Sequence, residues 1–274
     1  MAQVNQRVLP GFRLGLGFAL VYLTLMVVVP LGACVVKAAS LPRAEFVAAV
    51  WSPRAQAAYV LTFVAALIAA AISAVIGTLI AWVLVRYEFP GKKFFDAIVD
   101  LPFALPTAVA GLVFSNLYVP SGWFGQFLCP LGIEFAYSRP AIVLVMVFIG
   151  FPFVVRTLQP VLETLDAEVE EASAMLGASR GQTFLRVILP SILPGIVTGF
   201  ALAFARALGE YGSVVFVSSN IPGKTEIAAV LVVNKLEEFK YVEATAVATV
   251  LLGASFLMLA VINRLERWSR RWDR

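Results

Sequence analysis

The chain has 274 residues, of which 61% are hydrophobic and only 14% are charged, and its formal net charge is +4. Soluble domains are about half apolar and about a quarter charged, so this composition excludes an ordinary soluble domain and indicates a membrane protein. Histidine is absent, and the two cysteines, Cys34 and Cys129, are far apart. We therefore expect no catalytic residue, no metal site and no cofactor on this chain. The basic residues lack the interleaved aromatic pattern of nucleic-acid-binding proteins.

Six apolar stretches are long enough, or nearly long enough, to cross a membrane as helices, which takes about 20 residues. In chain order they are Leu14–Val36, Tyr59–Val85, Leu101–Val119, Ala141–Val155, Ile192–Val217 and Val242–Ile262. The third stretch is interrupted by Pro102 and Pro106, and the fifth contains Arg206 and Glu210. The pattern predicts an all-α polytopic membrane protein with six transmembrane helices.

The distribution of Lys and Arg predicts which loops face the cytoplasm, because cytoplasmic loops carry the excess of these residues. Both tails, the second loop and the fourth loop are rich in them. The C-terminal tail has the strongest cluster, with Arg264, Arg267, Arg270, Arg271 and Arg274. We therefore expect both termini, and the loop between the fourth and fifth spans, in the cytoplasm.

Three local patterns are not interpreted as sites. The stretch SSNIPGKT at 218–225 ends like a phosphate-binding loop but has Ser218 where that motif needs glycine. The stretch LGAC at 31–34 is similar to a lipoprotein cleavage site, but the apolar run is longer than a signal-peptide core, so we expect an uncleaved helix. The acidic residues between 163 and 171 lack a calcium-loop pattern and predict a solvated or partner-facing helix surface.

The fourth loop contains strong helix signals although it is polar. Asp166 is a predicted N-cap, Gly177 supplies the left-handed residue that ends a helix, and Ser179 with Gln182 forms a capping-box pattern. A narrow apolar stripe is formed by Val169, Ala172, Met175 and Leu176. Since the polar face is acidic, anionic lipid would repel it, and the pattern favours docking to a protein partner.

This segment resembles the cytoplasmic loop of permeases from ATP-binding-cassette importers, which reads E-A-A, three residues, G, nine residues, I, one residue, L-P. The matching residues are Glu171, Ala172, Ser173, Gly177, Val187, Leu189 and Pro190. Ser173 replaces the second alanine and Val187 replaces the isoleucine. In that family the loop forms a coupling helix seated in a cleft of the ATPase subunit, so the resemblance implies ATPase coupling through residues 160–190.

Longer stretches resemble sulfate/thiosulfate permeases, and more narrowly their T-type subunit. They are RVLPGFRLGLG near the start, RYEFPGKKFFDAIVDLPFALPTAVAGL at 86–112, PFVVRTLQPVLE at 152–163 and RALGEYGSVVF at 206–216. RALGEYG and LPTAVAG also occur in molybdate permeases, which are typically shorter at the N-terminus. The resemblance implies a type-1 importer permease domain over 57–262. Residues 1–56 then form the N-terminal tail, first helix and periplasmic loop, and 263–274 form a basic cytoplasmic tail.

The resemblance implies a permease subunit of the bacterial inner membrane rather than an enzyme, moving sulfate or thiosulfate by alternating access. A separate ATPase would bind ATP and Mg. The implied partners are a homologous second permease, two ATPase subunits and a periplasmic sulfate/thiosulfate-binding protein, besides membrane lipid. A molybdate or tungstate importer permease is the alternative. A secondary anion transporter fits less well, because intramembrane acids are scarce and inverted repeats are not evident.

Five residues are candidates for the anion pathway, each with a structural alternative. Pro102 and Pro106, with Thr107 after them, make irregular backbone that membranes tolerate only in a protein interior or along a wet path. Arg206 and Glu210 are one helical turn apart. They either form a self-neutralising pair that braces the subunit interface, or Arg206 lowers the barrier for a dianion while Glu210 holds its orientation.

Overall fold

The computed structural model describes residues 11–165 and 167–269, and the regular structure in this part of the chain consists of helices joined by loops, without a β-strand. The predicted all-α class is therefore confirmed. The elements are α1 (Phe12–Leu23), the π-helix η1 (Thr24–Val28), α2 (Val29–Ala39), α3 (Arg43–Val50), α4 (Pro53–Arg86), α5 (Lys92–Val99), α6 (Leu101–Ala104), α7 (Thr107–Tyr118), α8 (Gly125–Leu128), the 3₁₀-helix η2 (Cys129–Leu131), α9 (Arg139–Glu163), α10 (Ala167–Met175), α11 (Arg180–Thr183), the π-helix η3 (Phe184–Ile188), α12 (Leu189–Leu208), α13 (Val214–Val217), α14 (Ala228–Glu237) and α15 (Tyr241–Ser269).

Five helical runs in the described residues are long and apolar enough to cross a membrane. They are Phe12–Ala39, Pro53–Arg86, Arg139–Glu163, Arg180–Leu208 and Tyr241–Ile262. Each contains most of one predicted span. The remaining predicted span corresponds to a shorter apolar helix, Thr107–Tyr118. The count of six transmembrane helices and the cytoplasmic location of both termini stay predictions.

The predicted third span, Leu101–Val119, is not one helix. The chain is interrupted at Leu105 and Pro106, between α6 and α7. Pro102 does not break a helix, because it lies in the first turn of α6, where a missing N–H is tolerated. The other interruption is at Asp100, between α5 and α6.

The predicted fifth span, Ile192–Val217, ends too late. Helix α12 stops at Leu208, and the backbone turns through 209–213 before the short helix α13. Hydropathy alone missed this end, because apolar residues resume in α13 after the short stretch 209–213. Arg206 therefore lies in the last turn of α12, and Glu210 lies beyond the helix.

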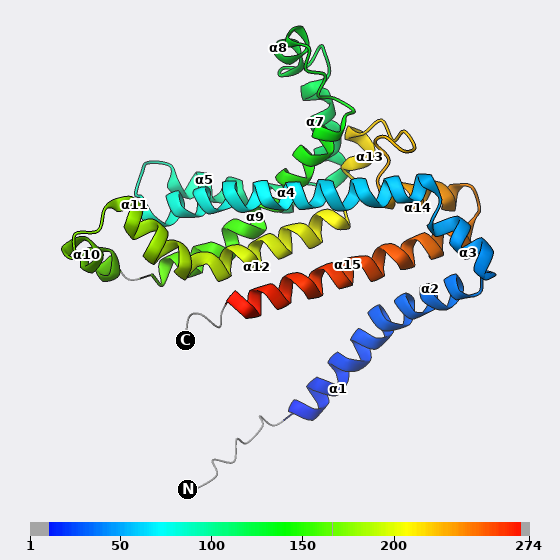
Figure 1. Ribbon diagram of the computed structural model, residues 1–274, viewed down its shortest axis with the longest axis horizontal. Coiled ribbons are helices and arrows are strands. Elements are labelled where there is room, and N and C mark those ends of the chain that lie inside the picture. Colours follow the sequence, from blue (N-terminus) through cyan, green and yellow to red (C-terminus); the bar gives the residue numbers. More distant parts are fainter. Residues whose placement is uncertain (1–10, 166, 270–274) are drawn as a thin grey trace, which may run out of the picture.

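Helices α4, α9 and α12 form the centre of the fold, and α15 runs beside α12 (Figure 1). The buried face of α4 is made of small residues, among them Ala66, Ala70 and Gly77. A Cβ on Gly77 would lie 2.6 Å from the Cβ of Val154 in α9, so glycine is needed for this close approach. Small residues bring membrane helices together because dispersion contacts then replace lipid contacts.

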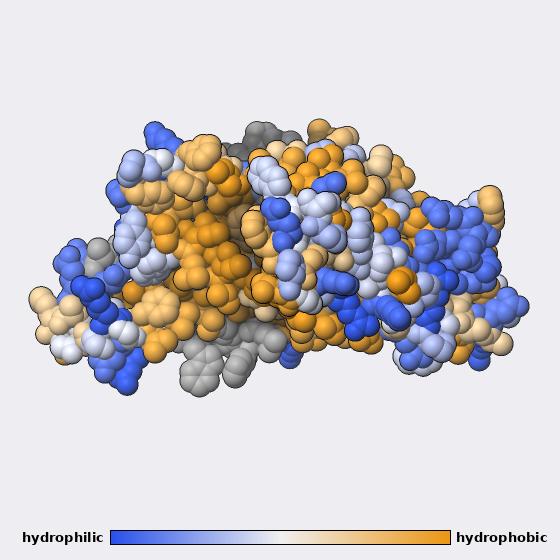
Figure 2. Space-filling model, turned by 90° about the horizontal axis from the view of Figure 1, so that it is seen from above, coloured by the Kyte–Doolittle hydropathy of each residue, from blue (hydrophilic) through white to orange (hydrophobic). Residues whose placement is uncertain are grey.

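The N-terminal helical run lies apart from the rest of the molecule, and only its α2 part packs on α15 (Figure 1). No residue of α1 is buried. Seen from above, hydrophobic residues dominate the middle of the molecule, and hydrophilic residues gather towards its two ends (Figure 2). This distribution is expected of a chain whose middle faces hydrocarbon and whose ends face water.

Candidate functional site

Helix α10 ends in the geometry that its sequence predicts. The N–H of Ala178 donates to the carbonyl oxygen of Ser173 over 3.1 Å, and the N–H of Gly177 donates to that of Ala174 over 2.9 Å. This is a Schellman motif, and Gly177 has a φ of 81°. A Cβ on Gly177 would meet no atom within 4 Å, so the requirement for glycine is conformational rather than steric. The predicted left-handed end of this helix is confirmed.

The second helix of the loop starts at once, as predicted. The hydroxyl of Ser179 accepts the N–H of Gln182, and the side-chain oxygen of Gln182 accepts the N–H of Ser179, which completes a capping box. The helical run then passes through the π-helix η3 into α12. The wider π turn lies just before Pro190, where an α-helical carbonyl would clash with the proline ring. The predicted N-cap of α10, Asp166, lies outside the described residues.

Helix α10 lies at one end of the molecule (Figure 1), and apolar side chains on it and directly after it are exposed. Met175 is 85% exposed, Leu176 is 88% exposed and Val169 is also exposed. Exposed apolar side chains grouped on one helix are typical of a docking surface. Of the matched importer-loop residues, Glu171 and Ala172 are exposed in α10, and Val187, Leu189 and Pro190 belong to the later helical run.

Contacts from the end of α4 hold α10 and the start of η3, and the sequence did not reveal them. Arg86 forms an ion pair with Glu170 over 2.8 Å, and its guanidinium lies 5.5 Å from the ring centroid of Trp82. The ring of Trp82 meets that of Phe184 edge to face at 5.9 Å. Glu170 is thus paired within the chain, whereas Glu163, Glu168 and Glu171 are exposed, as a solvated or partner-facing surface requires. A pair separated by 84 positions leaves no local signal in the sequence.

A hydrogen bond joins the two helices of the loop. The hydroxyl groups of Ser173 and Thr183 are 2.9 Å apart, and Thr183 is buried. Alanine stands at this motif position in the importer family, and the serine here adds a polar tie between α10 and α11. This hydrogen bond and the contacts of Arg86 together fix the orientation of α10 and therefore of its exposed residues.

The stretches LPTAVAG (105–111) and RALGEYG (206–212) meet in space. A Cβ on Gly111 of α7 would overlap the carbonyl oxygen of Ser213, and a Cβ on Gly212 would overlap the hydroxyl of Thr107. The hydroxyl of Ser115 also donates to the carbonyl oxygen of Phe216 over 2.9 Å. These contacts define a junction between α7 and residues 209–217. Gly111 is needed because two backbones touch there, and Gly212 leaves room for the side chain of Thr107.

Arg206 and Glu210 stabilise this junction. One carboxylate oxygen of Glu210 lies 2.6 Å from the guanidinium of Arg206. The other oxygen accepts the N–H of Ser213 over 2.8 Å and its hydroxyl over 2.7 Å. The side chain of Glu210 is only 2% exposed and that of Arg206 is 32% exposed. Because both oxygens of this buried carboxylate have donors, its burial is compensated.

Of the other pathway candidates, Thr107 lies in the junction, whereas Pro102 is buried in α6, which contacts α9. Pro106 is exposed at the break before α7. The structure thus brings Thr107, Arg206 and Glu210 into one region and places Pro102 in a different packing interface.

A second ionic cluster holds the amphipathic helix α5 on α9. Arg156 binds both oxygens of Asp100, at 2.8 and 2.6 Å, and one oxygen of Asp96 at 2.7 Å. Gln159 donates to the same oxygen of Asp96. Burial alone would raise the pKa of Asp96, but the hydrogen bonds from Gln159 and Arg156 outweigh it and lower that pKa below its ordinary value. Within the described ranges, no group of three or more His, Cys, Asp or Glu side chains is placed to hold a metal ion.

Comparison with known proteins agrees with this architecture. Residues 73–272 match the family model of the binding-protein-dependent transport system inner membrane component. The sulfate transport system permease protein CysT of Synechocystis sp. is 53% identical over 253 residues, covering 92% of this chain and 88% of that protein. CysT of Escherichia coli is 45% identical over 268 residues, covering 97% of both.

A solved structure shows the same fold at low sequence identity. It is the crystal structure of a bacterial alginate ABC transporter in complex with an alginate pentasaccharide-bound periplasmic protein. One of its chains matches with a TM-score of 0.77 and 17% identity, covering 93% of each chain. The predicted type-1 importer permease fold is confirmed, and the apolar helices make this a multi-pass protein of the inner membrane. The chain belongs to the family of inner membrane components of binding-protein-dependent transport systems.

Proposed function

We propose that this chain is a permease subunit of an ATP-driven importer for sulfate, with thiosulfate as a second substrate. The supporting observation is the identity of 53% over 92% of the chain to a sulfate permease. The resemblance of residues 171–190 to the coupling loop of importer permeases also supports the proposal. The chain would act as a permease and not as an enzyme, with ATP and Mg bound by a separate ATPase subunit.

The geometry of α10 supports a role in ATPase docking. The exposed apolar residues Val169 and Met175 of α10, and Leu176 directly after it, are not buried by any other part of the described chain. A short helix with such residues fits a groove on another protein. In this proposal two ATPase subunits close on ATP, and one of them moves α10. Arg86, Trp82 and the continuous run from α11 into α12 transmit the movement to the membrane helices.

The junction of α7 with residues 209–217 supports a structural role for Arg206 and Glu210 beside the anion path. One carboxylate oxygen of Glu210 pairs with Arg206 and the other accepts two hydrogen bonds from Ser213, so neither oxygen is available to a passing solute. We assign the pair to bracing the junction. The path itself would run between this permease and a homologous second permease, beside the irregular backbone at Pro106 and Thr107, and would open to alternate sides. A periplasmic sulfate- or thiosulfate-binding protein would deliver the anion.

Uptake of labelled sulfate tests the substrate. Cells that lack this chain should lose uptake, and the wild-type chain should restore it. Unlabelled thiosulfate should compete, whereas molybdate should compete poorly. Strong competition by molybdate alone would support the molybdate importer instead. Uptake that continues when the ATPase subunit carries an inactive ATP site would support a secondary transporter.

A further inference from the structure

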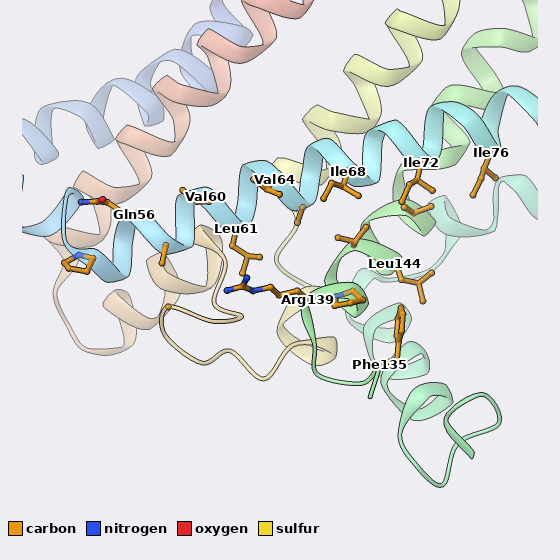
Figure 3. A pocket seen from close by; sticks show the side chains of 17 residues that line it. Gln56, Val60, Leu61, Val64, Ile68, Ile72, Ile76, Phe135, Arg139 and Leu144 are labelled. Atoms are coloured by element: carbon orange, nitrogen blue, oxygen red, sulfur yellow. The ribbon is translucent and has the colours of Figure 1, made fainter. Parts of the chain in front are cut away.

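A long apolar groove runs along the outer face of α4 and has no role in the proposed transport cycle. Its volume is about 940 Å³, and its second wall comes from residues 135–147 (Figure 3). One row of α4 side chains, spaced four residues apart, lines the groove: Val60, Val64, Ile68, Ile72 and Ile76. All five are exposed, so no part of the described chain covers them.

The end of the groove near Gln56 and Leu61 carries positive charge (Figure 3). Arg139 lines it and donates from Nε to the carbonyl oxygen of Lys224 over 2.7 Å. Within the part of the chain that the structure describes, neither Arg139 nor Lys224 forms an ion pair with a carboxylate. The groove is therefore apolar along its length and cationic at one end.

The dimensions fit one extended hydrocarbon chain. From Val64 to Ile76 a helix rises about 18 Å, and one leaflet of the hydrocarbon core is about 15 Å thick. Over the roughly 30 Å from Gln56 to Ile76, a volume of about 940 Å³ gives a mean cross-section of roughly 30 Å². A helix about 10 Å wide needs roughly 80 Å², so the groove is too narrow to enclose one.

The charged end also lies at the depth expected of a lipid headgroup. Arg86 ends α4 at the side of α10, and about 20 residues of helix cross the hydrocarbon core. Counting back about 20 residues from Arg86 places the opposite surface of the core near Ala66, so Leu61 lies about one and a half turns beyond it, among the headgroups. A cationic side chain at this depth attracts the phosphate of a lipid headgroup by its charge.

We propose that this groove binds one phospholipid with an anionic headgroup. One acyl chain lies along the α4 row, and the phosphate contacts Arg139 and Lys224. The lipid fills the space between α4 and α9 at the end opposite α10.

Native mass spectrometry of the full chain in its complex tests the proposal. The complex is extracted in mild detergent and mixed with phosphatidylglycerol or phosphatidylcholine that carry the same acyl chains. The wild type should retain one phosphatidylglycerol in preference to phosphatidylcholine. The double variant Arg139→Gln, Lys224→Gln should lose that preference, with phosphatidylglycerol retention falling about fivefold or more for the two charges. Arg43→Gln removes a charge from exposed α3 and should retain the lipid like the wild type.

A second variant tests the acyl-chain position. Ile72→Trp fills the groove without removing a charge, and it should reduce retention of both lipids while the circular dichroism spectrum stays unchanged. Equal retention of phosphatidylglycerol by the wild type and the Arg139→Gln, Lys224→Gln variant would overturn the proposal. Efficient disulfide crosslinking of Ile72→Cys to cysteines on the second permease would also overturn it, because the groove would then be a protein interface.

Discussion

At the scale of single residues, a side chain at Gly177 should impair coupling to the ATPase without preventing the chain from folding. Its φ of 81° disfavours any residue with a Cβ, and Gly177→Val should cost about 1 kcal/mol or more at the end of α10. Because the space around it is open, the variant should insert normally but misdirect α10. We expect sulfate uptake and co-purification of the ATPase to fall together.

Two further substitutions test whether the effect comes from the left-handed backbone of Gly177 or from adding a side chain in this loop. Asn tolerates the left-handed region, so Gly177→Asn should retain most of the coupling. Gly181 also lies in open space but in ordinary helical backbone, and Gly181→Ala should leave uptake unchanged. Wild-type uptake with normal ATPase co-purification in Gly177→Val would show that the left-handed residue does not orient α10.

The pair of Arg206 and Glu210 gives a second prediction at this scale. Arg206→Gln leaves a carboxylate buried at 2% exposure without its cation, and removing one partner of a buried pair costs about 3–5 kcal/mol. We expect loss of complex assembly, measured by size-exclusion chromatography. Glutamine at 210 can still accept the hydrogen bonds of Ser213, so the double variant Arg206→Gln, Glu210→Gln should recover assembly and uptake. Assembly with normal ATPase activity but no uptake in both variants would instead assign Arg206 to the anion path.

At the scale of elements, the orientation of α10 depends on the end of α4. Arg86→Gln removes the ion pair to Glu170 and the stacking on Trp82, together worth about 1 kcal/mol for partly exposed groups. We expect faster hydrogen exchange in 167–176 and unchanged exchange in the middle of α9. Arg180→Gln is the matched control, because Arg180 is an exposed arginine of the same loop. Equal exchange in both variants would mean that Arg86 does not hold α10.

The elements also show which features can be inferred from sequence. The capping box at Ser179 and the left-handed Gly177 were predictable, because caps depend on residues within a few positions of each other. The end of α12 was missed because apolar residues resume at Val214, after the short stretch 209–213 in which Gly209 is a local signal for a helix end. The path of this turn also depends on its contact with α7, which the sequence does not show. The ion pairs of Arg86 and Arg156 could not be predicted either, because their acidic partners lie 84 and about 60 positions away in the sequence.

At the scale of the whole molecule, transport by alternating access requires that the break before α7 meet water in only part of the cycle. Thr107 and Ala108 are partly buried in the described conformation, against the turn at Gly212. With Cys34 and Cys129 replaced, Ala108→Cys in the assembled importer should react with a small aqueous thiol reagent in one nucleotide state and be protected in the other. Ala110→Cys, at a position only 3% exposed on the same helix, should stay unreactive in both. The contrast matters because general loosening of the importer would expose both cysteines, whereas a path that opens beside the junction exposes only residue 108. If cysteines at 107 and 108 are unreactive in every nucleotide state, the irregular backbone serves packing alone and the anion path lies elsewhere.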